Sequence, residues 1–328
     1  MNSFLNKNTI IKLLVISILA ASLSFSGCGN KDDDTTVSST IKVDNKKDKK
    51  NKEDENLKED QTERPSLREK FDNAKKQNSD TVAWINIPNT TIDDPVVQDL
   101  QNRGKGNIDY YVHRDFKGNQ VAVGRDSAIM SMKKNVTTPF KNLSNNLVIS
   151  GHNVNLNDAP VGRMFEPLGN FKNLEFSKKT PYIFVTTDDK DLVYEVFASY
   201  YAEERFTYNL PKNNEKEMTD MINEAKKRSN FIYDDVDVSG KDKVLTLYTC
   251  TYHFGSYKTL GYYRVKYVVQ AKLLSDKEKL KAVANVKVNP NPKQVYYTYC
   301  AYCQKKMDLQ KCSANGGLCD DCLKKQNK

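Results

Sequence analysis

Three side chains that are far apart in the sequence have the chemistry needed for covalent acyl transfer. Cys250 ends the apolar segment 244–250, His152 closely follows the apolar segment 147–150, and Arg264 lies in a third such segment shortly downstream. A thiol supplies a nucleophile, an imidazole moves its proton, and a guanidinium stabilises an oxyanion. A lone thiol at a strand end is by default an inert buried side chain, so the chemistry requires a fold that brings these groups together.

The reaction expected from these groups is a two-step acyl transfer. A free cysteine titrates near pH 8.5 and a free histidine near 6.5, so at neutral pH only a few per cent of an unassisted thiol is ionised. His152 could hold Cys250 as a thiolate–imidazolium pair or pass a proton to the departing amine. Attack on a peptide carbonyl would leave an acyl-thioester on Cys250, and the Thr249 hydroxyl with nearby backbone amides could support the oxyanion. A second amine would then resolve the thioester.

A second group of cysteines near the C-terminus has metal-ligand spacing. Two C-x-x-C pairs are separated by fifteen residues, and their members are Cys300, Cys303, Cys319 and Cys322. This spacing predicts a zinc ribbon, in which four thiolates surround one structural ion. Disulfides are the alternative in a secreted protein. If Cys28 and Cys250 are set aside, the remaining set includes Cys312 and is odd, so it cannot pair completely, whereas zinc takes four cysteines. We expect a docking module whose partner the sequence does not identify.

The segments that must position the candidate site alternate short strands with turn signals, which predicts a β-barrel or sandwich. Besides 244–250, the expected strands cover 82–85, 91–97, 127–132, 147–150, 182–186, 192–200 and 262–269. Trp84, the only tryptophan, is expected to be a core residue.

Three segments have helical character. Leu67, Phe71 and Ala74 have helical spacing ahead of the first strand. Within 213–228, apolar residues recur at i, i+3, i+4 and i+7, namely Met218, Met221, Ile222 and Ala225. This second helix precedes the cysteine strand and serves either as a cover for the barrel or as a wall of a substrate groove. A charged run over 276–284 is also helix-like.

These residues carry a family resemblance. Thr-Leu-Tyr-Thr-Cys at 246–250, followed by an Arg-led strand and preceded by Gly151-His152-Asn153, resembles the sortases, the cysteine transpeptidases of Gram-positive cell surfaces. Further ordered motifs within about 65–275 resemble class B: Trp84-Ile85-Asn86-Ile87-Pro88, Asp94-Pro95-Val96-Val97-Gln98, Tyr110-Tyr111 with Arg114-Asp115-Phe116, Met164-Phe165 with Leu168, and Tyr194-Glu195-Val196-Phe197. The resemblance implies a mainly β fold, a closed eight-stranded barrel with an N-terminal helix and a helix inserted before the cysteine strand.

The resemblance also implies a function. Sortases cleave a sorting signal of surface proteins, often Asn-Pro-Gln-Thr-Asn-like or Leu-Pro-x-Thr-Gly-like in class B, and transfer it to a cell-envelope amine such as a peptidoglycan precursor. Catalysis needs no cofactor. Two alternatives use the same residues differently: a cysteine protease or other cell-wall transpeptidase on another fold, and a non-catalytic surface adaptor that binds through its ribbon.

The sequence offers three candidates for the catalytic histidine and two for the catalytic cation. His152 is preferred over His113 and His253 because it follows a strand and matches the family's Gly-His motif. In the expected strand 262–269, the position that matches the family's arginine is Lys266. It lies two residues after Arg264 and therefore on the same strand face. A lysine lacks the bidentate fork of a guanidinium, so we predict Arg264, with Lys266 as the alternative.

The first residues read as a targeting signal. Lys7 and Lys12 precede an apolar run over 13–25, which is short of the roughly 20 residues that span a bilayer. The run leads into Ser26-Gly27-Cys28, which resembles a bacterial lipobox, although Phe25 stands where leucine is usual. We therefore expect a lipid on Cys28 and a body on the extracellular face of the bacterial cell membrane. An uncleaved signal anchor is the alternative.

Composition supports this division of the chain. Hydrophobic residues make up 38% of it and the mean hydropathy is -0.70, which is low for one packed globule. The expected parts are a signal over 1–28, a charged tether over 29–64, a sortase domain over 65–276, a linker over 277–296 and a four-cysteine, zinc-ribbon-like module over 297–328. The net charge of +9 suits an anionic envelope. Nucleic acid is not expected, because the basic residues are not interleaved with stacking aromatic side chains.

Overall fold

The computed structural model describes residues 63–104, 110–121, 129–131, 144–155, 159–160, 162, 164–203, 206–209, 214–254, 265–295 and 297–326. The predicted signal segment with Cys28, nearly all of the predicted tether, and Arg264 lie outside these ranges. Within them, every helix is too short or too polar to cross a bilayer.

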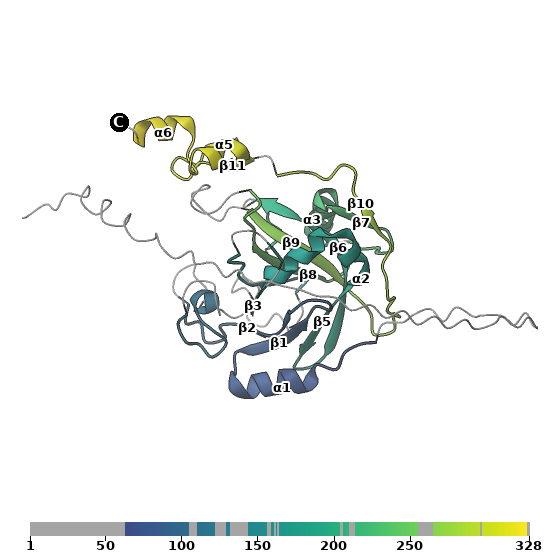
Figure 1. Cartoon of the computed structure of the whole chain (residues 1–328). Coiled ribbons are helices and arrows are strands. Elements are labelled where there is room, and N and C mark those ends of the chain that lie inside the picture. Colours follow the sequence, from purple (N-terminus) through teal and green to yellow (C-terminus); the bar gives the residue numbers. More distant parts are fainter. Residues whose placement is uncertain are drawn as a thin grey trace, which may run out of the picture. The chain divides into compact units, whose positions relative to one another are not determined.

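Eight strands form a closed barrel in the order β1-β2-β3-β4-β8-β9-β6-β5, with β5 pairing back onto β1 (Figure 1). The two seams on either side of β3 are the shortest, because β3 pairs with β2 and with β4 through only two residue pairs each. The predicted eight-stranded barrel is confirmed. Its strands are β1 (Thr81–Asn86), β2 (Asp93–Val97), β3 (Ile129–Ser131), β4 (Asn146–Ser150), β5 (Tyr182–Thr187), β6 (Asp191–Glu203), β8 (Val244–Cys250) and β9 (Val265–Leu273).

The strand that ends in Cys250 lies between two different kinds of neighbour. Strands β4 and β8 are parallel, and Ser150 pairs with Tyr248. Strands β8 and β9 are antiparallel, and Cys250 pairs with Lys266. Parallel strands end at the same edge of a sheet, so the residues that follow β4 meet the end of β8. Antiparallel pairing brings the start of β9 to that same edge.

Two helices cover the barrel as their periodicity predicts. Helix α1 (Arg68–Gln77) buries Phe71 and Ala74. Helix α3 (Glu215–Arg228) lies between β6 and β8 in the chain and buries the four predicted residues Met218, Met221, Ile222 and Ala225. The Asn214 side chain caps α3 by accepting a hydrogen bond from the backbone N–H of Glu217 at 2.9 Å. This cap satisfies one of the free donors that every helix start exposes.

The prediction of a helix over 276–284 is wrong. This stretch forms turns, and its backbone bonds to other parts of the molecule. Leu280 is buried in a cluster with Leu67 and Tyr182, while the backbone N–H of Lys281 donates to the Tyr182 hydroxyl at 2.8 Å. These tertiary contacts outweigh the helical propensity of the charged run. Trp84 packs against the same cluster, half-buried, and its ring N–H donates to Asp93 Oδ1 at 2.7 Å.

The remaining elements connect the barrel or follow it. Their bounds are η1 (Tyr110–His113), η2 (Glu166–Lys172), α2 (Leu174–Lys179), β7 (Phe231–Tyr233), β10 (Val286–Val288), β11 (Tyr297–Tyr299), β12 (Lys306–Asp308), α5 (Leu309–Ala314) and α6 (Asp320–Gln326). Strand β7 pairs with β10, and β11 pairs with β12. We call residues 297–326 the C-terminal module.

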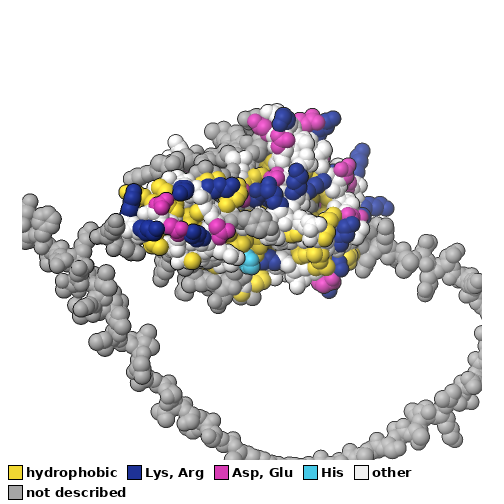
Figure 2. Space-filling model, turned by 90° about the horizontal axis from the view of Figure 1, so that it is seen from above, with side chains coloured by type: hydrophobic (Ala, Val, Ile, Leu, Met, Phe, Trp, Pro, Cys, Tyr) yellow, Lys and Arg dark blue, Asp and Glu magenta, His cyan; other side chains and the backbone are white. Residues whose placement is uncertain are grey.

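Basic side chains are distributed over the surface. On the face shown in Figure 2, Lys and Arg lie among acidic and apolar side chains. Many of them form ion pairs with exposed carboxylates, such as Lys216 with Asp220 and Lys311 with Asp320. Exposed pairs of this kind contribute little to stability. On this face the basic side chains are therefore mixed with acidic ones rather than gathered into one patch.

A buried ion pair fixes α3 to the end of β6. Arg228 and Glu203 are each less than a tenth exposed, and Arg228 Nη2 lies 3.0 Å from Glu203 Oε1. Arg228→Ala is expected to lower the free energy of unfolding by about 3–5 kcal/mol, because it leaves the Glu203 charge buried without its main partner. Chemical denaturation measures this. The double variant Arg228→Met, Glu203→Leu should lose clearly less, and equal losses in the two proteins would contradict the explanation.

Candidate functional site

Cys250 and Lys266 form a close pair at the mouth of the barrel. The Cys250 side chain is partly exposed at the end of β8, and Lys266 faces it from β9. Lys266 Nζ donates to Cys250 Sγ across 3.1 Å. An ammonium group at this distance stabilises negative charge on the sulfur or on a substrate atom bonded to it. Arg264, the predicted cation, lies outside the described residues, so its role stays a prediction.

His152 is held in one orientation by the backbone. Its Nε2 lies 2.8 Å from the carbonyl oxygen of Val112. Because a carbonyl only accepts, Nε2 carries the proton, and the Nδ1 of a neutral ring is then a free base. Burial, together with the positive charges of His113 and Lys266, lowers the pKa of His152 below 6.5 despite the opposing hydrogen bond to Val112. The imidazole is therefore neutral at neutral pH.

Side-chain hydrogen bonds connect the histidine segment to the cysteine strand and to Tyr252, which follows it. Asn153 Nδ2 donates to the Cys250 carbonyl at 3.0 Å, and the Tyr252 hydroxyl donates to the Asn153 carbonyl at 3.0 Å. The buried Thr249 hydroxyl donates to the Gly151 carbonyl at 2.8 Å. These bonds fix the position of residues 151–153 relative to Cys250. The role of Thr249 as an oxyanion donor stays a prediction, because its proton is directed at Gly151 in this structure.

Gly151 is required by a close packing contact. A Cβ at this position would lie 2.8 Å from Cγ of Phe165, which is closer than carbon atoms pack. The backbone N–H of Phe165 also donates to the His152 carbonyl at 3.2 Å. The glycine therefore lets the η2 region support the histidine segment. This contact explains why Gly precedes His152 and gives Phe165 a structural role.

The other two histidines occupy different environments. His113 is exposed next to Val112, and its positive charge contributes to the lowered pKa of His152. His253 is exposed three residues after Cys250, and its ring stacks on Tyr201 with centroids 5.0 Å apart. Among the described residues, the hydrogen bond from a ring nitrogen to a backbone carbonyl is found for His152.

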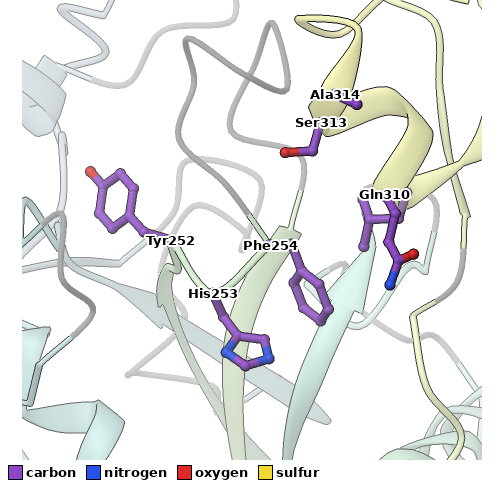
Figure 3. Close-up of a pocket in the computed structure, with 7 residues that line it drawn as sticks. Tyr252, His253, Phe254, Gln310, Ser313 and Ala314 are labelled. Atoms are coloured by element: carbon purple, nitrogen blue, oxygen red, sulfur yellow. The ribbon is translucent and has the colours of Figure 1, made fainter.

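A cleft opens beside the cysteine strand. It has a volume of about 770 Å³ and lies between residues 252–254, which follow β8, and helix α5 of the C-terminal module (Figure 3). Its lining residues are Tyr252, His253, Phe254, Leu309, Gln310, Ser313 and Ala314. The volume is within the range of ligand-binding sites. No sequence pattern indicated this cleft, because its two walls are more than fifty residues apart.

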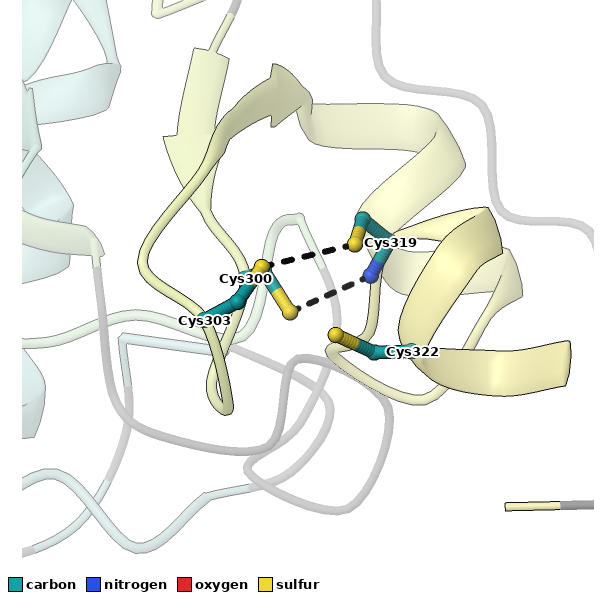
Figure 4. Close-up of side chains that lie close together, drawn as sticks. All are labelled: Cys300, Cys303, Cys319 and Cys322. Atoms are coloured by element: carbon teal, nitrogen blue, oxygen red, sulfur yellow. Dashed lines mark hydrogen bonds between the residues drawn. The ribbon is translucent and has the colours of Figure 1, made fainter. Parts of the chain in front are cut away.

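The four predicted metal-ligand cysteines converge (Figure 4). Their sulfur atoms all lie within 4.8 Å of one another, and the Sγ atoms of Cys303 and Cys319 are 3.6 Å apart. A tetrahedron with zinc–sulfur bonds of about 2.3 Å has edges of about 3.8 Å, whereas a disulfide is about 2.05 Å long. The backbone N–H of Cys319 donates to Cys300 Sγ at 3.3 Å. The donor set and its spacing therefore fit a thiophilic metal ion.

The two cysteine pairs lie on different kinds of structure. Cys300 and Cys303 lie in the turn between β11 and β12, while Cys319 and Cys322 lie at the start of α6. The module is therefore a hairpin with helices rather than two hairpin knuckles. Cys312 is outside the group, as the odd count predicts, and is fully buried in an apolar cluster.

Comparisons with known proteins agree with this geometry. A family model described as the sortase domain matches residues 85–274. Sortase B of Listeria monocytogenes is 28% identical over 212 residues, which make up 64% of this chain and 76% of that protein. Sortase B of Staphylococcus aureus is 29% identical over 185 residues, or 56% of this chain and 68% of that protein.

Solved structures show the same likeness. The X-ray structure of Clostridium perfringens sortase B matches with a TM-score of 0.50 and 27% identity, covering 62% of this chain and 99% of that one. A Staphylococcus aureus sortase B–substrate complex matches with a TM-score of 0.50 and 26% identity, covering 64% and 87%. A sortase B complexed with triglycine matches with a TM-score of 0.51 and 25% identity, covering 64% and 88%. Because the family model spans more than half of the sequence and ends next to the last strand of the barrel, this chain belongs to the sortases, a family of cysteine transpeptidases.

Proposed function

We propose that this sortase cleaves a sorting signal in surface proteins and transfers the new acyl end to a cell-envelope amine, with Cys250 as the nucleophile. The observation that carries the proposal is the 3.1 Å contact between Lys266 Nζ and Cys250 Sγ at an exposed barrel edge to which the His152 segment is hydrogen-bonded. A partly exposed thiol beside a fixed cation is a reactive environment, unlike the buried thiol of an inert core cysteine.

The reaction then has two balanced steps. The Cys250 sulfur attacks the scissile carbonyl, and the amide C–N bond breaks as the carbon–sulfur bond remains in a thioester. The neutral His152 ring receives the thiol proton and returns it to the departing amine. In the second step an amine attacks the thioester, a C–N bond forms as the C–S bond breaks, and the proton lost by the amine passes through His152 to restore the Cys250 thiol. Lys266 keeps its charge next to the sulfur and the oxyanion throughout.

A contact in the structure supports a different cation from the one predicted from the sequence. The contact with Cys250 supports Lys266 as the residue that stabilises charge at the sulfur. Lysine presents one compact charge, which is sufficient for a sulfur or oxyanion but cannot clamp two oxygens at once as arginine can. Arg264 remains a second candidate, two residues earlier in the chain.

The substrate and acceptor classes follow from the relatives. Solved sortase B structures include one complex described as containing substrate and another containing triglycine. We infer that this chain likewise takes a sorting-signal peptide and an amine acceptor, such as the free amine of a peptidoglycan precursor. Membrane attachment through Cys28, or through an uncleaved anchor, and a charged tether belong to the same proposal and are supported by the sequence.

The decrease of kcat/KM at low pH should reflect protonation of the neutral His152 ring. Because the pKa of His152 is lowered, the ring is still neutral somewhat below pH 6.5. On the acid side, kcat/KM should therefore reach half of its maximum at a pH below 6.5. A pH profile of kcat/KM with saturating amine measures this midpoint. His113→Gln should move it upward by removing a neighbouring positive charge. A midpoint clearly above 6.5 in the parent enzyme would contradict this role for His152.

An assay of the residues 63–328 protein tests the function itself. A panel of fluorogenic peptides with Asn-Pro-Gln-Thr-Asn-like and Leu-Pro-x-Thr-Gly-like signals is incubated with and without triglycine. We expect a peptide–triglycine ligation product that depends on the amine. Hydrolysis that ignores the amine would favour a cysteine protease, and no turnover of any peptide would favour an adaptor.

We also propose that Cys300, Cys303, Cys319 and Cys322 bind one structural zinc ion. Their mutual distances and the N–H donor to Cys300 support four thiolate ligands with no open position, so the ion would fold the module and take no part in catalysis. Metal analysis of the purified protein should give about one zinc per chain. Cys319→Ser should lose it, and Cys312→Ser should keep it. Absence of zinc, with the four cysteines oxidised in pairs, would reject the proposal.

A further inference from the structure

The C-terminal module packs directly against the catalytic edge of the barrel. A buried cluster joins Val265, which begins β9, to Leu309 and Cys312 of α5, and Phe254 packs against it. Val265 is the neighbour of Lys266, and successive strand residues point to opposite faces. At the start of β9, the Val265 side chain therefore contacts the module, while the Lys266 side chain, on the opposite face, contacts the Cys250 sulfur. The module lies beyond residues 85–274, which the sortase domain model matches.

The cleft between α5 and residues 252–254 lies within reach of the scissile bond. A chain extends at most about 3.6 Å per residue, so the Cα of Tyr252 is at most about 7 Å from that of Cys250, and the Cα of Phe254 at most about 14 Å. A substrate peptide bonded to Cys250 would enter the cleft within about two to four residues. Ser313 lines the cleft from α5, and the aromatic side chains of Tyr252 and Phe254 line it from the segment that follows β8 (Figure 3).

The lining indicates what the cleft binds. Apart from His253, the described residues that line it have aliphatic, aromatic, amide or hydroxyl side chains, and none of these described residues carries a carboxylate. A protonated amine acceptor needs a carboxylate or several carbonyl groups in such a site, whereas a neutral peptide needs apolar contacts and a few hydrogen-bonding groups. We propose that α5 and residues 252–254 form a subsite for uncharged substrate residues two to four positions from the scissile bond.

This subsite rests on the proposed transpeptidase function, and its test uses substrates of two lengths. One peptide contains only the signal pentapeptide selected from the panel, and two others extend it by four uncharged residues on the N-terminal or the C-terminal side. Ala314→Trp, at an exposed position of α5, fills the cleft. Lys325→Trp places the same bulk on the exposed face of α6 and serves as the matched control.

We expect Ala314→Trp to raise KM about tenfold for one of the two extended peptides, with little change for the pentapeptide or for triglycine. Lys325→Trp should resemble the parent for every substrate. The extended peptide that responds identifies the side of the scissile bond that the cleft binds. Equal effects on all peptides, no effect on any, or a change confined to the KM for triglycine would overturn the subsite.

A second measurement does not depend on the tryptophan variant being folded. Hydrogen exchange is followed in the Cys250→Ala protein with and without a saturating amount of the extended peptide. Backbone amides of α5 should exchange more slowly with the extended peptide than with the pentapeptide. Unchanged exchange in α5, in a protein that binds the peptide, would also overturn the proposal. Failure of the parent enzyme to turn over any peptide is a separate result, which rejects the proposed function instead.

Discussion

Cys250→Ala is expected to reduce kcat/KM for peptide ligation by about 10⁴-fold or more. The thioester cannot form without the sulfur, and the residual rate would come only from substrate binding and oxyanion stabilisation. The fluorogenic peptide and triglycine assay measures the loss. Because Cys250 is partly exposed at the end of its strand, the substitution leaves little buried space and should change the melting temperature only slightly.

A matched pair of substitutions separates chemistry from binding. Cys250→Ala should still bind the signal peptide, as measured by fluorescence anisotropy, while Cys312→Ala should retain the nucleophile. Cys312 is buried in the module's apolar cluster, so its loss affects stability and the cleft rather than the chemical step. Retention of substantial ligation by Cys250→Ala would remove the covalent mechanism.

Lys266→Ala is expected to reduce kcat/KM by about 10²–10³-fold, mainly through kcat. The substitution removes the only cation that, among the described residues, donates a hydrogen bond to the Cys250 sulfur. Removal of one preorganised charge or donor from a developing oxyanion typically has an effect of this size. Steady-state kinetics under the same ligation conditions measure it.

The arginine position supplies the control for this prediction. Arg264→Ala should lower kcat/KM less than Lys266→Ala does, and Lys266→Arg should recover part of the activity because a guanidinium can also donate to the sulfur. If Arg264→Ala is inactive and Lys266→Ala is close to the parent enzyme, then the contact at 3.1 Å has no catalytic role and the original choice of Arg264 is correct.

Much of the fold was predictable because local patterns and tertiary structure agree. The apolar period of Met218, Met221, Ile222 and Ala225 predicts α3, and all four side chains are buried. Short apolar runs bounded by turns predict the strands that form the barrel. The run over 276–284 is different, because Leu280 and Lys281 are held by distant partners that have no signal in the local sequence.

The site was only partly predictable for a related reason. Residue type and motif lead to Cys250 and His152, but the register that sets Cys250 opposite Lys266 depends on the pairing of β8 with β9. The position along the strand indicates Lys266, whereas the chemistry of a guanidinium favours Arg264, and residue type alone does not separate the two. The hydrogen bonds that Asn153 and Tyr252 donate near the site could not be predicted from the sequence. The one indication was that Asn153 directly follows His152.

The C-terminal module was also only partly predictable from the sequence. The spacing of Cys300, Cys303, Cys319 and Cys322 predicts that their sulfurs converge, and they lie within 4.8 Å of one another. Spacing alone does not show that the second pair lies on a helix, nor that α5 faces the segment that follows Cys250. Those facts depend on how Val265 and Leu309 pack together.

The most direct test of the central claim is the intact mass of the enzyme during turnover. The protein is mixed with a signal peptide without an acceptor amine, quenched in acid and analysed by mass spectrometry. We predict a species heavier by the acyl part of the peptide, located on Cys250 by fragmentation and discharged when triglycine is added. If the peptide is cleaved while no adduct forms on Cys250, or if an adduct forms and triglycine does not discharge it, Cys250 is not the carrier of a transferable acyl group.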